Sequence, residues 1–499
     1  MNNSLQLIRF RVLLTFCVTA YCYVMGAAAC QANELPTMQQ ADAKRPNILF
    51  AIADDWGWPH SGAYGDPVVK TPAFDRLARE GILFEHAYVS SPSCTPSRGA
   101  ILTGQYHWRL GAAANLWSVF PDRLTTYPEI LERAGYQTGH SSKAWGPGRT
   151  ETKQRLLAGK AYPNFPTFWK SRDADKPFCY WLGSSDPHRP YDLNSGERSG
   201  MDLTKIKLPA CFPDNATVRG DVADYYFEVQ RFDKLVQDAL EVLDRAGELD
   251  NTIVVMTGDH GMPFPRAKSN LYDTGVRVPL AIRWPKGIDH PRKTAAFISL
   301  TDLAPTFLAA ATVEIPAEMT GKSLLPLFSG DDSGRDQVVF GKERHVPAQE
   351  APDSGGYPCR GIRNHDFLYI RNFEPDRWPN GTPNYEKAFL PGTWYGDTDN
   401  GPTKTYIIEN KDKDEAHQLY YNLSFAKRPA EELYDLRVDP DQLQNVAGEE
   451  KHKSQLKSLS EQLTTILAET KDPRTLGKGE MFDEFPYFGG GPKHPAWKE

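Results

Sequence analysis

The sequence predicts an α/β fold, in which helices cover both faces of a sheet, followed by a smaller C-terminal α+β domain. Up to about residue 330, short apolar runs of strand length alternate with helical patterns. From about Gln337 the strand-like runs follow one another without long helices between them. A chain of 499 residues is also too long for one compact core. We therefore expect a larger domain over residues 45–330 and a smaller one over 331–499, divided near the Gly- and Asp-rich segment Ser329 to Gly334.

The first elements of the larger domain are a strand and two helices. The strand is predicted at 46–53, a continuous apolar run that ends at a pair of aspartates. Such a run is typical of a central parallel strand that is buried on both faces. Helices are predicted at 71–80, with Thr71 as the N-cap, and at 126–134, and a glycine ends each of them.

Later strands and helices follow from the same patterns. Four more apolar runs predict strands of the first sheet, with a long helical pattern among them. Two further runs predict strands of the smaller domain, which also has a polar helix near its end. The predicted strands are 178–182, 252–256, 279–282, 296–300, 338–340 and 367–370, and the predicted helices are 221–246 and 449–469.

The first 32 residues have the pattern of a secretory signal peptide. Arg9 and Arg11 precede the apolar run from Val12 to Met25, and the small residues Gly26 to Ala29 follow it. A transmembrane anchor is the alternative, but the run is short for a bilayer span and contains two threonines. We expect cleavage, no stable membrane span, and a secreted or periplasmic protein. Lipoprotein anchoring through Cys30 is a minor alternative.

The net charge argues against nucleic acid and membranes as partners, and the cysteine content argues against a disulfide framework or a zinc site. With 57 basic and 64 acidic residues, the formal net charge of -7 offers no general attraction to nucleic acid or to anionic membranes. An anionic substrate must therefore meet a local cationic site. Beyond the apolar run of the signal segment only Cys30, Cys94, Cys179, Cys211 and Cys359 remain, which are too few and too irregularly spaced for a disulfide framework or a zinc motif. Cys179 lies in an apolar run and is expected to be a small buried residue.

One cysteine lies in a specific motif. The segment from Cys94 reads C-x-P-S-R and is followed by Leu102-Thr-Gly. If a helix begins near Cys94, Arg98 lies four residues on and on the same face, where its guanidinium steadies an oxyanion beside position 94. The helix N-terminus adds a favourable field for an anion. The alternative from this segment alone is a buried cysteine at the start of a helix.

The motif is similar to the signature of the type I sulfatases. Further matches follow in the same order along almost the whole chain, and the likeness within the family is greatest to the N-sulfoglucosamine sulfohydrolases, the heparan sulfamidases. The resemblance implies an alkaline-phosphatase-like mixed sheet sandwiched by helices. It also implies that a formylglycine-generating enzyme converts Cys94 into formylglycine (3-oxoalanine). The matching segments are 54–55, 71–81, 258–261, 432–436 and 439–440, and those of the sulfamidase likeness are 61–64, 186–189, 263–265 and 269–272.

The resemblance further implies a calcium site. Asp54, Asp55, Asp259 and His260 would ligate one Ca²⁺ together with the modified residue at position 94, and an oxygen-rich set suits a hard cation. Taken separately, each pair reads equally well as an ordinary loop after a strand. Together at the carboxyl ends of strands, where α/β sheets bind ligands, they favour a site. His260 stands where many relatives have Asn, which leaves the identity of the metal open.

Three further residues resemble the sulfate-binding and proton-transfer residues of the family: Lys143, His188 and Lys268. By this resemblance His188, or Lys268, protonates the leaving oxygen or nitrogen. The chain departs from the family at Trp145, because relatives commonly carry a histidine two or three residues after the lysine. His140, a carboxylate or solvent are the alternatives for that missing base.

The resemblance implies hydrolysis of a sulfate ester or sulfamate on a sulfated saccharide. The hydrated formylglycine would attack sulfur with one hydroxyl, and its second hydroxyl would let inorganic sulfate leave. The substrate is an N-sulfoglucosamine or an O-sulfated sugar. Two alternatives stay open: a phosphoryl or phosphonate ester hydrolase of the same superfamily, and a silent glycan-binding protein in which Cys94 stays a thiol.

Charged and aromatic residues of the smaller domain have two interpretations. The segments 343–345 and 360–363 either grip sugar carboxylates or sulfates or form a charged surface. The segments 371–373 and 377–379 are either a sugar-stacking platform or a packed aromatic corner.

Overall fold

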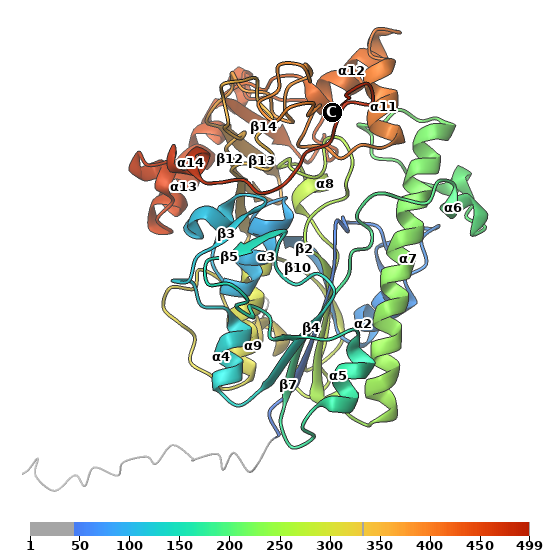
Figure 1. Cartoon of the computed structure of the whole chain (residues 1–499), viewed down its shortest axis with the longest axis vertical. Coiled ribbons are helices and arrows are strands. Elements are labelled where there is room, and N and C mark those ends of the chain that lie inside the picture. The colour runs from blue at the N-terminus through green and yellow to red at the C-terminus, as the bar shows by residue number, and fades with distance from the viewer. Residues whose placement is uncertain (1–43, 332–333, 499) are drawn as a thin grey trace, which may run out of the picture. The chain divides into compact units, whose positions relative to one another are not determined.

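A mixed eight-stranded sheet forms the centre of the structure, which is a computed structural model (Figure 1). The strand order is β10-β2-β9-β8-β1-β7-β4-β6. The neighbouring strands β4, β7, β1 and β8 run parallel, whereas β9 is antiparallel to both β8 and β2. The strands are β1 Asn47–Ala53, β2 Ile82–Tyr88, β4 Gln137–Ser141, β6 Lys160–Ala161, β7 Phe178–Gly183, β8 Thr252–Gly258, β9 Leu280–Arg283 and β10 Arg292–Ser299.

Residues 44–331 and 334–498 are described by the structure. The predicted signal peptide, including Cys30, lies outside the described residues. From Arg45 onward the chain forms one compact unit. Among the described residues, no helix is both long enough and apolar enough to cross a bilayer.

Strand β1 faces two separate hydrophobic cores. Its side chains alternate, so Ile48, Phe50 and Ile52 enter one core while Leu49 and Ala51 enter the other. Helices α3, α4 and α9 cover the first core, and α2, α5 and α7 cover the second. Figure 1 shows α4 and α9 on one side of the strands and α7 on the other. These helices are α2 Pro72–Glu80, α3 Cys94–Thr103, α4 Tyr127–Arg133, α5 Phe165–Ser171, α7 Ala216–Arg245 and α9 Leu303–Ala310.

A second, antiparallel sheet with the order β11-β12-β13-β14 follows. Helix α13 packs on one face of it through Leu459, Leu463 and Leu467. Val338 and Phe340, on its opposite face, belong to the first core of the large sheet. The boundary between residues 330 and 331 stays a prediction. The elements here are β11 Gln337–Lys342, β12 Cys359–Asn364, β13 Phe367–Asn372, β14 Glu431–Asp435, α11 Pro402–Glu409, α12 Glu415–Phe425 and α13 Lys453–Glu469.

Short elements connect these parts. They are β3 Ser118–Phe120, β5 Gly148–Thr150, α6 Ser195–Arg198, α8 Asp273–Val276, α10 Leu325–Phe328 and α14 Met481–Glu484. The sequence-predicted fold class, with a mixed sheet between helices and a smaller C-terminal sheet, is confirmed. Cys179 is also buried as expected, at 2% exposure.

Candidate active site

The candidate residues come after four neighbouring parallel strands. Lys143 follows β4, His188 follows β7, and the pairs 54–55 and 259–260 directly follow β1 and β8. Their carboxyl ends lie at one edge, where Ala53 is paired with Gly258. At the end of β7, a Cβ on Gly183 would lie 2.1 Å from the Lys143 carbonyl oxygen, so only glycine lets the Lys143 loop pass this closely.

Cys94 is the first residue of α3 and is 2% exposed. Burial raises the pKa of its thiol, so the thiol keeps its proton near neutral pH. The Sγ atom lies 3.2 Å from His260 Nε2. One turn into the helix, Ser97 Oγ donates a hydrogen bond to the Asp259 carbonyl at 2.5 Å, which ties α3 to the loop after β8.

Arg98 is fully buried and binds protein groups through all of its nitrogens. Its Nε donates to Asp259 Oδ2 at 2.7 Å, and its two terminal nitrogens donate to the carbonyls of Lys143, Ala144 and Ala53. A terminal nitrogen also lies 3.5 Å from Asp54 Oδ1. The guanidinium therefore joins the loops after β1, β4 and β8, and direct support of an oxyanion stays a prediction.

The predicted metal ligands converge, and one of their atoms has no partner. Ligand atoms of Asp55, Cys94 and His260 lie within 4.8 Å of one another, as do those of Asp54, Cys94 and Asp259. His260 Nδ1 lies 3.0 Å from the Gly261 carbonyl, which can only accept, so Nδ1 carries a proton. The other ring nitrogen, Nε2, is 3.1 Å from Asp55 Oδ1, a buried oxygen without a hydrogen bond.

His260 Nε2 and Asp55 Oδ1 are both buried atoms with lone pairs, and at this distance they require a cation or a proton between them. The donor set of carboxylates and one imidazole therefore fits a bound metal ion. The backbone of Asp55 supports this, because its φ of 76° is left-handed and sparsely populated for residues other than glycine.

Two lysines neutralise the aspartates after β1. Lys143 Nζ lies 2.5 Å from Asp54 Oδ1, and Lys268 Nζ lies 2.9 Å from Asp55 Oδ2. Burial opposes ionisation of Asp54, but Lys143 and Arg98 outweigh it and hold the pKa of this carboxyl well below its usual range. Burial likewise opposes the charge of Lys268, yet neighbouring carboxylates raise its pKa. The site thus holds the Asp54 carboxylate and the Lys268 ammonium in their charged forms.

His188 faces a cleft of about 660 Å³ that also exposes Lys143 and Trp145. Its side chain is 35% exposed, in contrast to the buried Asp55. Nδ1 lies 2.6 Å from the Arg189 carbonyl and so carries a proton, which turns Nε2 toward Asp55 Oδ2 at 3.9 Å. His188 is thus both accessible and oriented.

Trp145 stands at the position of the missing family histidine, and His140 is one of the alternatives for that base. Trp145 packs edge-on against Phe120, and its buried Nε1 has no hydrogen-bond partner. His140 Nδ1 lies 3.0 Å from the Gly159 carbonyl, and the ring lines another cavity, of about 600 Å³. His140 therefore does not line the cleft that exposes Lys143 and His188, and a carboxylate or solvent stays open as the missing base.

Charged residues of the smaller domain form buried ion pairs. Arg360 is fully buried between Glu343 and Asp472, and Arg363 pairs with Asp273. The charged-surface interpretation of 343–345 and 360–363 is therefore wrong, because side-chain charges that have partners of opposite sign can be buried. Arg360 does not reach the cleft either.

Two residues of that domain contact the site region directly. His345 Nδ1 lies 2.8 Å from the hydroxyl of Ser93, the residue before Cys94. Asp399 Oδ2 lies 2.8 Å from Lys268 Nζ. Sequence reasoning included His345 only as part of a charged segment and missed Asp399, because the latter lies in a Gly- and Asp-rich loop without a motif.

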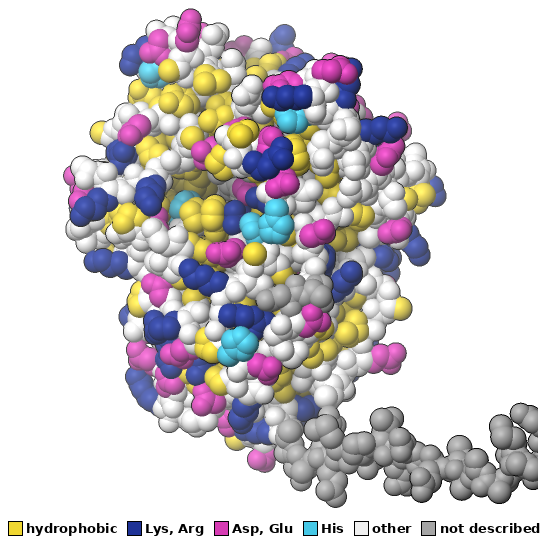
Figure 2. Space-filling view, turned by 180° about the vertical axis from the view of Figure 1, so that it is seen from behind, with side chains coloured by type: hydrophobic (Ala, Val, Ile, Leu, Met, Phe, Trp, Pro, Cys, Tyr) yellow, Lys and Arg dark blue, Asp and Glu magenta, His cyan; other side chains and the backbone are white. Residues whose placement is uncertain are grey.

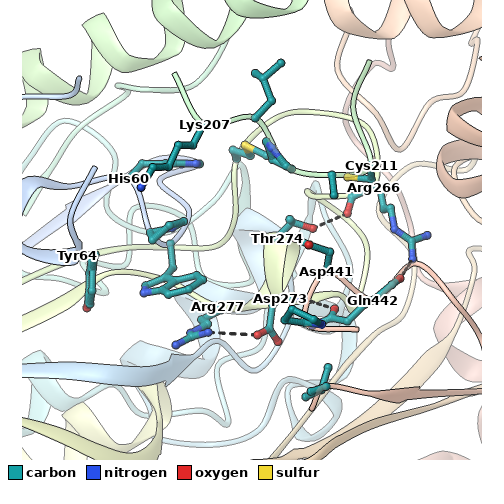
Figure 3. A pocket seen from close by; sticks show the side chains of 18 of the residues that line it. His60, Tyr64, Lys207, Cys211, Arg266, Asp273, Thr274, Arg277, Asp441 and Gln442 are labelled. Atoms are coloured by element: carbon teal, nitrogen blue, oxygen red, sulfur yellow. Dashed lines mark hydrogen bonds and ion pairs between the residues drawn. The ribbon is translucent and has the colours of Figure 1, made fainter. Parts of the chain in front are cut away.

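A third cavity, of about 400 Å³, is shown in Figure 3. Its lining includes Trp58 and Tyr64, but none of the nine predicted site residues. Figure 3 shows Arg277 directed at Asp273, and the same guanidinium lies 3.5 Å from the centre of the Trp58 ring. On the face shown in Figure 2, Lys and Arg side chains are interspersed with Asp and Glu.

Comparison with known proteins gives a consistent family. The sulfatase model matches residues 46–313, and the model of the C-terminal part of N-sulphoglucosamine sulphohydrolase matches residues 258–378. The chain therefore belongs to the sulfatase family, with the alkaline-phosphatase-like fold, and is by class a sulfate ester or sulfamate hydrolase.

Individual relatives narrow the likeness further. N-sulphoglucosamine sulphohydrolase of Homo sapiens is 30% identical over 503 aligned positions, which cover 89% of this chain and 94% of that protein. An ulvan-active sulfatase of Formosa agariphila is 30% identical, and the alignment covers 83% of this chain and 78% of that protein. A structure solved in complex with its substrate D-glucosamine-2-N,6-O-disulfate has a TM-score of 0.59 at 22% identity. The structural match covers 86% of this chain and 99% of that chain, so the two proteins share the fold. Within the family the chain is thus sulfamidase-like.

Proposed function

We propose that this enzyme hydrolyses a sulfate ester or sulfamate on a sulfated glycan, using a formylglycine made from Cys94 and one Ca²⁺. The observation that carries the proposal is the convergence of Cys94 Sγ, Asp55 Oδ1 and His260 Nε2 at the carboxyl edge of the sheet. This nucleophile position lies beside three cationic side chains, Arg98, Lys143 and Lys268. A sulfo group, whose oxygens repel an incoming nucleophile, needs this combination.

The residues that would hold Ca²⁺ are Asp54, Asp55, Asp259, His260 and the modified residue 94. When bound, Ca²⁺ supplies positive charge to the sulfo oxygens, and the hydrated aldehyde supplies a hydroxyl nucleophile at neutral pH.

The chain's own residues bind and orient the substrate and move a proton. In the proposal Lys143 and Lys268, which pair with Asp54 and Asp55, bind the sulfo oxygens. Arg98 positions Asp259 and the Lys143 loop. His188 delivers a proton to the leaving oxygen or nitrogen, because its Nε2 faces the site and its ring reaches the cleft.

The substrate class of the proposal is a sulfated saccharide, with either an N-sulfoglucosamine or an O-sulfated sugar as the reacting residue. The likeness to N-sulphoglucosamine sulphohydrolase supports the first, and the likeness to an ulvan-active sulfatase supports the second. A phosphonate ester hydrolase is the alternative that the same anion site would fit. We also propose that the protein is secreted or periplasmic, and that a formylglycine-generating enzyme converts its Cys94.

Sulfate release by the purified enzyme tests the proposal. Protein co-expressed with a formylglycine-generating enzyme should release sulfate from N-sulfoglucosamine or from O-sulfated sugars, and Cys94→Ala should release none. No release from N-sulfoglucosamine rejects the sulfamidase assignment alone. Hydrolysis of a phosphonate ester without hydrolysis of any sulfated sugar would instead favour the alternative, and binding of sulfated glycan without turnover would favour a silent binding protein.

A further inference from the structure

A loop of the C-terminal part of the chain brings an additional carboxylate to the candidate active site. Asp399 lies between β13 and α11, and its Oδ2 is 2.8 Å from Lys268 Nζ. The same ammonium lies 2.9 Å from Asp55 Oδ2. Ligand atoms of Asp55, His188 and Asp399 lie within 4.8 Å of one another. Asp399 therefore lies beside His188, the proposed proton donor, and beside Lys268.

The protein fixes the position of this loop. Lys342 Nζ is 2.9 Å from Asp397 Oδ2, and the backbone N–H of Val346 donates to Asp397 Oδ1 at 2.9 Å. The buried Lys404 Nζ lies within hydrogen-bond distance of four oxygens of the loop, which are those of the Trp394, Tyr395 and Thr398 carbonyls and of the Asn400 side chain. These contacts place Asp399 without help from a ligand.

Charge balance alone does not explain Asp399. Lys268 already has a carboxylate partner in Asp55, and both of these side chains are almost completely buried, at 3% and 0% exposure. The Asp399 side chain keeps 21% exposure, and among the described residues its Oδ1 has no hydrogen-bond partner. The Lys268 ammonium pairs with Asp55 and with Asp399 Oδ2, so neither pair involves Asp399 Oδ1. This second oxygen of Asp399 is thus available to a ligand.

We propose that Asp399 determines specificity by accepting a hydrogen bond from a hydroxyl or amino group next to the scissile sulfo group. The inference rests on the proposed function, because it takes the leaving atom to lie beside His188. A carboxylate accepts strong hydrogen bonds from neutral or cationic donors and repels a second sulfate or a carboxylate. The favoured substrates are therefore sugars whose scissile sulfo group is flanked by hydroxyl or amino groups, and vicinally disulfated sugars are excluded.

The test compares two substrates that differ only in a sulfate on the neighbouring carbon. The wild-type enzyme should prefer the monosulfated sugar in kcat/KM. Asp399→Asn, which keeps the shape and removes the charge, should shift this ratio by about 10–100-fold toward the disulfated sugar. Asp412→Asn, in an exposed ion pair with Lys411, is the matched control and should leave the ratio unchanged. A parallel fall on both substrates, or no shift, would overturn the inference.

A binding measurement separates this inference from the proposed function. In the Cys94→Ala background, which needs no turnover, calorimetry should show that Asp399→Asn weakens binding of the monosulfated sugar and strengthens binding of the disulfated one. Equal changes for both sugars would contradict a role in specificity. If the wild type hydrolyses neither sugar while the binding shift is present, the proposed function fails and the specificity role of Asp399 stands. Thermal unfolding of each variant checks that it is folded.

Discussion

The proposed proton donor is the most accessible of the candidate side chains. His188 Nδ1 is bound to the Arg189 carbonyl, so the ring is held and its other nitrogen faces the site. We predict that His188→Asn loses about 10²–10⁴-fold in kcat on a sugar sulfate, whose alkoxide leaving group needs a proton. The loss on 4-nitrophenyl sulfate should be much smaller, because nitrophenolate leaves without one. Equal losses on both substrates would contradict the role of His188 as the acid.

Arg98 links three loops of the site by charge. Its guanidinium is fully buried, and its Nε donates to Asp259 Oδ2 at 2.7 Å. We predict that Arg98→Met lowers the free energy of unfolding by about 3–5 kcal/mol, because it removes the cation that is paired with the buried Asp259 carboxylate and a donor from three backbone carbonyls. Denaturant unfolding measures this loss. Arg98→Lys keeps the charge and should lose less, and an unchanged midpoint for Arg98→Met would contradict the role.

Single residues were predictable from the sequence where a motif carried them. The ligand positions and His188 lie in matched segments, whereas Asp399 reaches the site only because distant chain segments hold its loop. The environment of Trp145 could not be predicted from the sequence either, because it depends on packing against Phe120. Tertiary contacts of this kind leave no local pattern.

At the scale of elements, helix α2 begins on a buried carboxyl of α7. Asp233 accepts hydrogen bonds from the backbone N–H groups of Ala73 and Phe74, at 3.0 and 2.9 Å. Burial raises the pKa of Asp233 from 3.8 to about 7 in spite of these bonds. Between about pH 4 and about pH 7, Asp233 therefore keeps its proton in the folded protein, whereas the unfolded chain has lost it. The stability that this group contributes is full below about pH 4 and is lost as the pH rises through about 7.

This gives a pH-dependent prediction. The free energy of unfolding of the wild type, relative to that of Asp233→Asn, should fall by about 1–3 kcal/mol between about pH 4 and about pH 8. Urea unfolding at a series of pH values measures the difference. Asp238→Asn, at an exposed position of α7, is the control and should give no such slope. A difference that rises with pH would show that Asp233 is ionised in the folded protein.

Elements with strong patterns were predicted well and those set by pairing were not. The apolar run of β1 and the capped helix α4 agree with the structure within one residue at each end. The antiparallel direction of β9 depends on its neighbours β8 and β2, which periodicity cannot reveal. Strands β2, β4 and β12 were missed, because polar residues interrupt their apolar runs.

At the scale of the whole molecule, metal binding should stabilise the fold. Three aspartates, Asp54, Asp55 and Asp259, lie close together in the interior and repel one another. An ion that binds only the folded state stabilises it by mass action. We predict that chelation lowers the melting temperature and the activity together, and that Ca²⁺ restores both. Asp259→Ala should lose the Ca²⁺ response in differential scanning calorimetry, whereas Asp412→Asn should keep it. A Ca²⁺ response that survives in Asp259→Ala would contradict the ligand assignment.

The central claim is that position 94 carries a formylglycine in a sulfatase active site. Mass spectrometry of the peptide that spans Val89 to Arg98 tests it most directly, on protein from a host with a competent formylglycine-generating system. The account predicts the mass of the aldehyde, or of its hydrate, in place of the cysteine. An unmodified thiol at Cys94 in protein from that host would contradict it.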